Sequence, residues 1–198
     1  MVWLLADGPR KVWRGIEEEL RARENDPLST IVETDICQLL SSLGREDEAI
    51  RHAQRALELD PGFPLAHLYL AEAYAGKKNY PEAIIEARKA LDLSADPAWA
   101  QSMLARMYAL TGQIDKGQEI LHAMLETANQ REDLAICLAR VYAALGKREA
   151  AFAWLERAYR NHEGGLILLH VDPEFQTIRQ DPRFTGLVGR IGLRYPSS

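Results

Sequence analysis

The chain has 198 residues, 47% of them hydrophobic and 27% charged, which provides enough apolar side chains for a sizeable core and excludes intrinsic disorder. Its formal net charge of −5 at pH 7 excludes a broad electrostatic attraction to nucleic acid or to an anionic membrane. The apolar start over Val2 to Ala6 is too short for a membrane span or for the core of an export signal, so we expect a cytoplasmic protein without direct nucleic-acid or membrane contact.

The first predicted element is a helix over Val12 to Arg23, which ends before the turn Asn25-Asp26-Pro27. A similar turn, Leu59-Asp60-Pro61, follows 34 residues later. This arrangement predicts the second helix of a half repeat, whose first helix would be the short stretch from Val2 to Ala6. We therefore expect either a frayed N-terminal cap or a chain that is a piece of a longer protein.

From Thr30 to Gly165 the sequence repeats itself every 34 residues without an insertion. The columns that carry this repeat include Leu40, Tyr74, Tyr108 and Tyr142, then Ile36, Leu70, Leu104 and Leu138, and then Ala49, Ala83, Gly117 and Ala151. A fixed period of this length is typical of a solenoid, in which each unit buries its apolar face only against its neighbours. Function is therefore expected on a surface.

Each repeat is predicted to contain two antiparallel helices. Small residues at helical spacing form a stripe that lets the helices approach closely, as at Ala49, Ala53 and Ala56. Between the two helices the sequence places Gly44, Gly112 and Gly146, because a glycine in the left-handed conformation ends a helix at low cost. Lys78 takes this column in one repeat, and Gly76, two residues earlier, predicts a shifted turn there.

Within this register, Leu70-Ala71-x-x-Tyr74 followed by Ala83 resembles the tetratricopeptide repeat. The first half of the pattern returns at Leu104-Ala105-x-x-Tyr108 and Leu138-Ala139-x-x-Tyr142. The resemblance implies an all-α fold, namely a right-handed helical solenoid with a C-terminal helical cap. The bulky fourth position departs from the pattern, because it holds Glu33, His67, Gln101 and Ala135. The first helices are therefore predicted to pack through the neighbouring columns Val32, Ala66, Ala100 and Leu134.

The period divides the chain into an N-terminal partial repeat over 1–29, four full repeats over 30–63, 64–97, 98–131 and 132–165, and a capping segment over 166–198. In the last segment we predict a short apolar helix, two Asp-Pro turns and an amphipathic helix that cover the end of the solenoid. The covering residues are expected to be Leu166, Ile167, Leu169, Phe175, Phe184, Leu187, Val188 and Ile191. This segment resembles the ends of the repeat regions in bacterial winged-helix regulators, adenylate cyclases and receptor-like Ser/Thr kinases.

The sequence contains no arrangement that catalysis or metal binding would need. Its five histidines form no recognised metal-ligand spacing, and no glycine-rich phosphate loop is present. We therefore expect no enzyme activity, no metal and no cofactor. Cys37 and Cys137 lie three repeats apart, which is too far for a disulfide, and both are predicted to be small buried residues in a reducing compartment.

In tetratricopeptide proteins the first helices of successive repeats line a concave groove that receives an extended peptide, and the resemblance implies such a groove here. The predicted groove residues are Thr34, Gln38, Leu68, Glu72, Trp99, Ser102, Arg106, Ile136 and Arg140. Arg106 and Arg140 share one column in adjacent repeats, so both guanidinium groups are expected to meet a carboxylate-bearing peptide. The alternative is that they pair internally with Glu72.

The leading functional prediction is a noncatalytic interaction module that binds a protein or peptide in this groove. The alternative, which the C-terminal resemblance motivates, is a regulatory or dimerising sensor domain of a larger bacterial signalling or transcription protein. That alternative implies a homodimer. The repeat pattern does not name the partner, because the residues that tune a binding surface leave no imprint on the packing columns.

Overall fold

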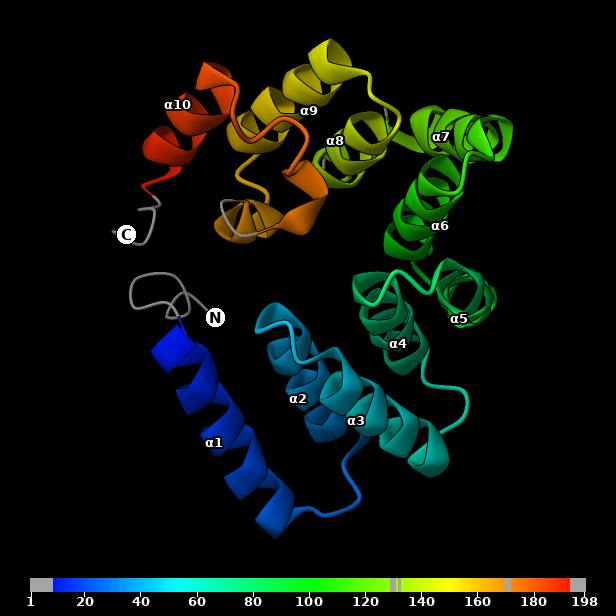
Figure 1. The fold of residues 1–198 in the computed structure, drawn as a ribbon, viewed down its shortest axis with the longest axis vertical. Coiled ribbons are helices and arrows are strands. Elements are labelled where there is room, and N and C mark those ends of the chain that lie inside the picture. The colour runs from blue at the N-terminus through cyan, green and yellow to red at the C-terminus, as the bar shows by residue number, and fades with distance from the viewer. Residues whose placement is uncertain (1–8, 129–130, 132, 170–171, 193–198) are drawn as a thin grey trace. The chain divides into compact units, whose positions relative to one another are not determined.

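A computed structural model describes residues 9–128, 131, 133–169 and 172–192, and all regular structure in these ranges is helical (Figure 1). The backbone packs as two compact units, an N-terminal unit over Asp7–Ala100 and a C-terminal unit that begins at Gln101. Within the described ranges, no helix combines the length and apolarity needed to cross a membrane. The predicted all-α class is confirmed.

The N-terminal unit contains one helix followed by two complete helix pairs. The bounds are α1 Pro9–Asn25, α2 Thr30–Ser42, α3 Glu46–Leu59, α4 Pro64–Gly76 and α5 Tyr80–Leu93. Helix α2 packs on α1, α3 and α4, and α5 packs on α4. The side chain of Ser29 caps α2 by accepting a hydrogen bond from the Val32 backbone N–H. The helix predicted over Val12 to Arg23 is confirmed as α1, whereas its predicted partner over Val2 to Ala6 lies outside the described residues.

Stripes of small residues hold the second helices close to the first. The stripes are Ala49, Ala53 and Ala56 on α3, and Ala83, Ala87 and Ala90 on α5, all at most 1% exposed. Val32 on α2 and Ala66 on α4 are buried. They belong to the column that was predicted to pack in place of the polar fourth repeat position. Side chains this small let two helix backbones approach closely, so the sequence pattern sets the geometry of each pair.

The turn between the two helices has the same backbone conformation in every repeat. Gly44, Gly112 and Gly146 have φ angles of 70°, 77° and 70°, in the left-handed region. Lys78 adopts a φ of 61° at the same column, although its Cβ disfavours this conformation. The predicted shift of this turn toward Gly76 is therefore wrong. The repeat register fixes the turn, and the Lys78 N–H still donates to the Ala75 carbonyl at 2.8 Å.

Buried contacts between an acid and a histidine occupy the fourth repeat position in the N-terminal unit. Glu33 is fully buried, and its carboxylate lies 2.6 Å from Nδ1 of His52 and 2.9 Å from Nε of Arg55. One repeat later the roles are exchanged, because Nδ1 of His67 lies 2.6 Å from the carboxylate of Glu86. A buried charge is costly unless it is paired. The departure from the repeat pattern is thus compensated inside each helix pair.

The C-terminal unit contains two more helix pairs and a closing segment. Their bounds are α6 Ala98–Leu110, which begins just before the boundary, α7 Ile114–Ala128, α8 Ala135–Ala144, α9 Arg148–Arg160, the 3-10 helices η2 Gly164–Leu168 and η3 Pro173–Phe175, and α10 Pro182–Ile191. A Cβ on Gly117 would lie 3.0 Å from the Ala105 carbonyl oxygen, so α7 approaches α6 closely. Glu163 caps α8, because its carboxylate accepts from the N–H groups of Ala135 at 3.0 Å and Ile136 at 2.9 Å.

The closing segment covers the last helix pair, with η3 packed on α8 and α10 packed on α9 (Figure 1). Asp181 caps α10 by accepting from the Arg183 N–H, and Gly192 ends it with a φ of 80°. The predicted short apolar helix is observed as η2. The covering residues that are buried are Leu166, Leu169, Phe175, Phe184, Leu187 and Val188. Ile191 is half-buried, and the side chain of Ile167 lies outside the described residues.

Candidate interaction surface

The predicted groove residues of the N-terminal unit differ in accessibility. Thr34 and Leu68 are only 1% and 4% exposed. The Thr34 hydroxyl donates to backbone carbonyls one turn earlier in α2, so its hydrogen-bonding capacity is used within the helix. Gln38, Glu72 and Trp99 are partly exposed. A ligand therefore has access to these three side chains, whereas Thr34 and Leu68 form part of the packing.

Three apolar residues in the first turns of α2, α4 and α6, which we call the first-turn row, are Ile31, Leu65 and Trp99. Ile31 is 61% exposed and Leu65 is 41% exposed. The Trp99 ring packs edge-on against Tyr69 of α4, with centroids 5.6 Å apart and an interplanar angle of 84°. Exposed apolar side chains in a row are typical of an interaction site. The repeat register places Ile31 and Leu65 in the same groove-lining column as Trp99.

Three titratable groups on α1, α2 and α4 have raised pKa values, with burial as the largest cause in each. Burial, followed by the charges of Glu72 and Asp35, raises the pKa of Tyr69 above its ordinary value. Burial also raises the pKa of Asp35, and burial followed by the Asp35 charge raises the pKa of Glu19. Because Tyr69 contacts Trp99, Glu72 and Asp35 lie near the Trp99 end of the row.

In the C-terminal unit, Ser102 and Ile136 belong to the core. Ser102 is fully buried, and its hydroxyl donates to the Cys137 carbonyl at 3.1 Å. Ile136 is 6% exposed and would contact a Cβ on Gly165 at 3.1 Å. Cys137 is a free, buried thiol whose pKa is raised to about 11, chiefly by burial. These side chains fix α8 against its neighbours rather than face a ligand.

Arg106 and Arg140 hold carboxylates of the chain's own closing segment. The Arg140 guanidinium lies 2.9 Å from Asp172 through Nη2, and its Nε donates to the same Oδ2 at 3.0 Å. Nε of Arg140 also lies 3.2 Å from Oε2 of Glu174, whose other oxygen pairs with Arg106. The predicted pairing was with a peptide carboxylate or, alternatively, with Glu72. The structure adds a third arrangement, in which the closing segment supplies both acids.

Residues 172–175, which carry both acids, also form hydrogen bonds within the closing segment. Oδ1 of Asp172 accepts from the Glu174 N–H at 2.9 Å, and Nη2 of Arg179 donates to the Asp172 carbonyl at 2.6 Å. Phe175 is fully buried and packs at a tilt on Phe184, with ring centroids 6.1 Å apart. The sequence indicated a turn at Asp172. It did not indicate that the acids of this turn contact Arg106 and Arg140, because turn residues do not encode which distant helix a segment packs against.

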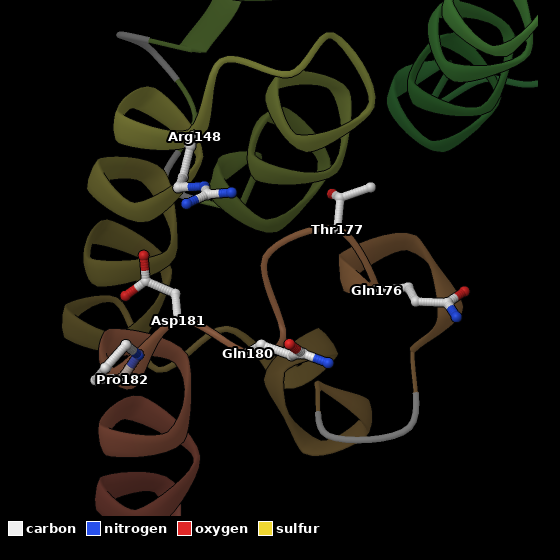
Figure 2. A pocket seen from close by; sticks show the side chains of 6 residues that line it. All are labelled: Arg148, Gln176, Thr177, Gln180, Asp181 and Pro182. Atoms are coloured by element: carbon white, nitrogen blue, oxygen red, sulfur yellow. The ribbon is translucent and has the colours of Figure 1, made fainter.

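A hollow of about 400 Å³ lies between the first residue of α9 and residues 176–182 of the closing segment. Figure 2 shows the side chains that line it. It is lined by Arg148, Gln176, Thr177, Gln180, Asp181 and Pro182. Hydrogen bonds from Arg183 lower the pKa of Asp181 to about 2. Polar and mostly exposed walls do not suit the enclosure of a small molecule. Nor does any group of three or more His, Cys, Asp or Glu side chains gather to hold a metal ion in the described part of the chain.

Comparison with known proteins identifies the fold. The tetratricopeptide repeat family model matches residues 36–98, and no curated protein matches the sequence. A solved tetratricopeptide repeat protein from Parabacteroides merdae is 17% identical, with a TM-score of 0.67 over 94% of this chain and 74% of that chain. A thermophilic protein of the same kind from Thermus thermophilus is 18% identical, with a TM-score of 0.63 over 81% and 88% of the two chains. YrrB, described as having an unusual peptide-binding site, is 18% identical, with a TM-score of 0.53 over 88% and 91%. The chain therefore has the all-α fold of tetratricopeptide-repeat solenoids, built from antiparallel helix pairs.

Proposed function

We propose that the chain is a noncatalytic interaction module that binds a peptide or protein segment on the first-helix face of its N-terminal unit. The observation that carries this proposal is the exposure of Ile31 and Leu65 at equivalent positions on α2 and α4. The same column continues to the partly exposed Trp99 on α6. Because α2, α4 and α6 each carry one such side chain, an extended partner can use one apolar anchor for each of these helices that it crosses.

The charges near the row define the partner's chemistry. Burial and the charges of Glu72 and Asp35 raise the pKa of Tyr69, so negative charge lies beside the ring that contacts Trp99. A partner with lysine or arginine next to apolar side chains complements this charge and buries the first-turn row. Among the predicted groove residues, Gln38, Glu72 and Trp99 are the ones this partner would touch.

Relatives with the same fold support the proposal by analogy. YrrB, to which the chain is structurally similar, is described as carrying a peptide-binding site. Because fold alone does not decide function, the exposed row and its charges support the proposal more directly than this likeness does.

The test is a selection of random peptides displayed against the full chain, followed by titration of one enriched peptide by fluorescence anisotropy. We expect the enriched peptides to combine apolar side chains with lysine or arginine. Ile31→Ser and Leu65→Ser should each weaken binding about tenfold, because each removes about 1–2 kcal/mol of apolar burial. Ile85→Ser is the matched control, since Ile85 is 52% exposed in the same unit but lies on the second helix α5.

Two results would refute the assignment. Selection that enriches no sequence, with the protein folded, would contradict the interaction function itself. Loss of binding in Ile85→Ser with no effect of Ile31→Ser or Leu65→Ser would move the site to the second helices.

The alternative, a regulatory or dimerising domain of a larger bacterial signalling protein, stays a prediction. Sedimentation equilibrium of the chain at high concentration tests it, because a dimerising sensor predicts a concentration-dependent rise in mass. A mass that stays monomeric would count against a homodimer.

A further inference from the structure

Two arginines on successive first helices hold two acids of one short segment. The side chains of Arg106 and Arg140 are 10% and 14% exposed, and those of Asp172 and Glu174 are 6% and 7% exposed. The four charges contact one another directly and are largely shielded from water. This is a built recognition site for carboxylates, since arginine presents several donors in a fixed plane.

The spacing of the site follows from the repeat. Arg106 and Arg140 occupy the same column in adjacent repeats, whose first helices are spaced by roughly 8–10 Å when packed. Asp172 directly precedes the 3-10 helix η3, and its Oδ1 accepts from the Glu174 N–H at 2.9 Å, so one turn presents both carboxylates. Arg140 contacts both acids and Arg106 contacts Glu174, so an acidic residue, any residue and a second acidic residue in this turn match the arginine pair. The aromatic Phe175 follows directly and is fully buried.

Residues 172–180 are buried on one side only. Phe175 and Ile178 are buried, but Gln176, Thr177 and Gln180 are exposed and line the polar hollow in Figure 2. The attachment of this segment therefore depends on the arginine contacts and on two apolar side chains. Removal of the segment alone would take the carboxylates of Asp172 and Glu174 away from two largely buried guanidinium groups, which is unfavourable. Exchange for another acidic segment keeps them paired.

We propose that Arg106 and Arg140 form a docking site for an acidic-x-acidic-aromatic segment of a partner, and that residues 172–175 occupy this site as an intramolecular competitor. The inference deepens the proposed interaction function, because it adds a second, charge-selected surface whose access the closing segment controls. A partner without the two carboxylates does not displace residues 172–175, since it would leave the guanidinium groups unsatisfied.

The test uses a fluorescein-labelled synthetic peptide with the sequence of residues 169–180, titrated into the full chain by anisotropy. The double variant Asp172→Asn with Glu174→Gln weakens the internal competitor while both arginines stay in place. It should bind the peptide at least about tenfold more tightly than the unchanged chain, because residues 172–175 occupy Arg106 and Arg140 in a smaller fraction of the molecules. A peptide with Asn and Gln at the two acidic positions should not bind. Glu149→Gln is the matched control, since Glu149 is an exposed acid paired with Arg183 in the same unit, and it should leave the peptide affinity unchanged.

A second measurement uses the unchanged chain, so it tests the proposal even if the double variant does not fold. With the peptide in excess, amide hydrogen exchange should accelerate across residues 172–179, while α8 stays protected. Equal peptide affinity in the folded double variant and the unchanged chain, or exchange over 172–179 that the peptide does not alter, would overturn the proposal and identify the segment as a permanent cap. Neither result touches the first-turn row, so the proposed function and this inference fail separately.

Discussion

Replacement of Lys78 by glycine is expected to stabilise the N-terminal unit. Lys78 has a φ of 61° at the column where the other repeats have glycine. It is exposed and lies in the turn that follows helix α4. A side chain in the left-handed region costs about 1–2 kcal/mol. Glycine removes this cost but makes the unfolded chain more flexible, which offsets about 0.5–1 kcal/mol. The expected net gain is therefore about 0.5–1 kcal/mol.

The backbone hydrogen bonds of the turn should survive the change. The Lys78 N–H donates to the Ala75 carbonyl and the Asn79 N–H donates to the Tyr74 carbonyl, and neither bond involves the Lys78 side chain. Urea unfolding followed by circular dichroism measures the free energy, and the melting temperature should rise by about 1–4 °C. Gly112→Ala is the reciprocal control, because Gly112 has a φ of 77° and should lose stability when a Cβ is added.

A lower urea midpoint for Lys78→Gly, with an unchanged slope of the transition, would refute the reasoning. It would mean that the lysine side chain makes a favourable contact that outweighs its backbone strain. A Gly112→Ala variant as stable as the unchanged chain would also contradict the assignment of the left-handed column as the source of the effect.

Three further predictions concern the C-terminal unit. Glu163→Ala should lower the free energy of unfolding by about 1–2 kcal/mol in a urea titration, because two backbone N–H groups of α8 lose their acceptor, whereas the exposed Glu126→Ala should have little effect. The carboxyl of Asp181 should titrate near pH 2 by NMR, and its pKa should return toward the ordinary value in Arg183→Gln. Because the pKa is lowered in the folded state, the contribution of this carboxylate to stability is present above pH 3.8 and is lost as the pH falls through 2. Cys137 should resist alkylation between pH 7 and 9 in the folded chain, since burial raises its pKa to about 11, and rapid native-state labelling measured by mass spectrometry would contradict its burial.

The sequence by itself determined the elements that depend on neighbours within one or two repeats. The alanine stripes at Ala49, Ala53 and Ala56 specify close helix pairs, and the 34-residue register specifies where each pair turns. Even Lys78 follows this register, because the turn position is set by the length of both helices rather than by the residue in it. The turn lies at Lys78 and not at Gly76, because the 34-residue period sets its position more strongly than a single glycine does.

Only the tertiary structure decided which charges meet. Glu33 pairs with His52, 19 residues away, and Arg140 pairs with Asp172, 32 residues away. The sequence contains these charges, but their distances depend on helix orientation and on where the closing segment returns. The arginine column was therefore predictable as a carboxylate site, whereas its occupant was not, because a coulombic partner is selected by position in space and leaves no periodic signal in the chain.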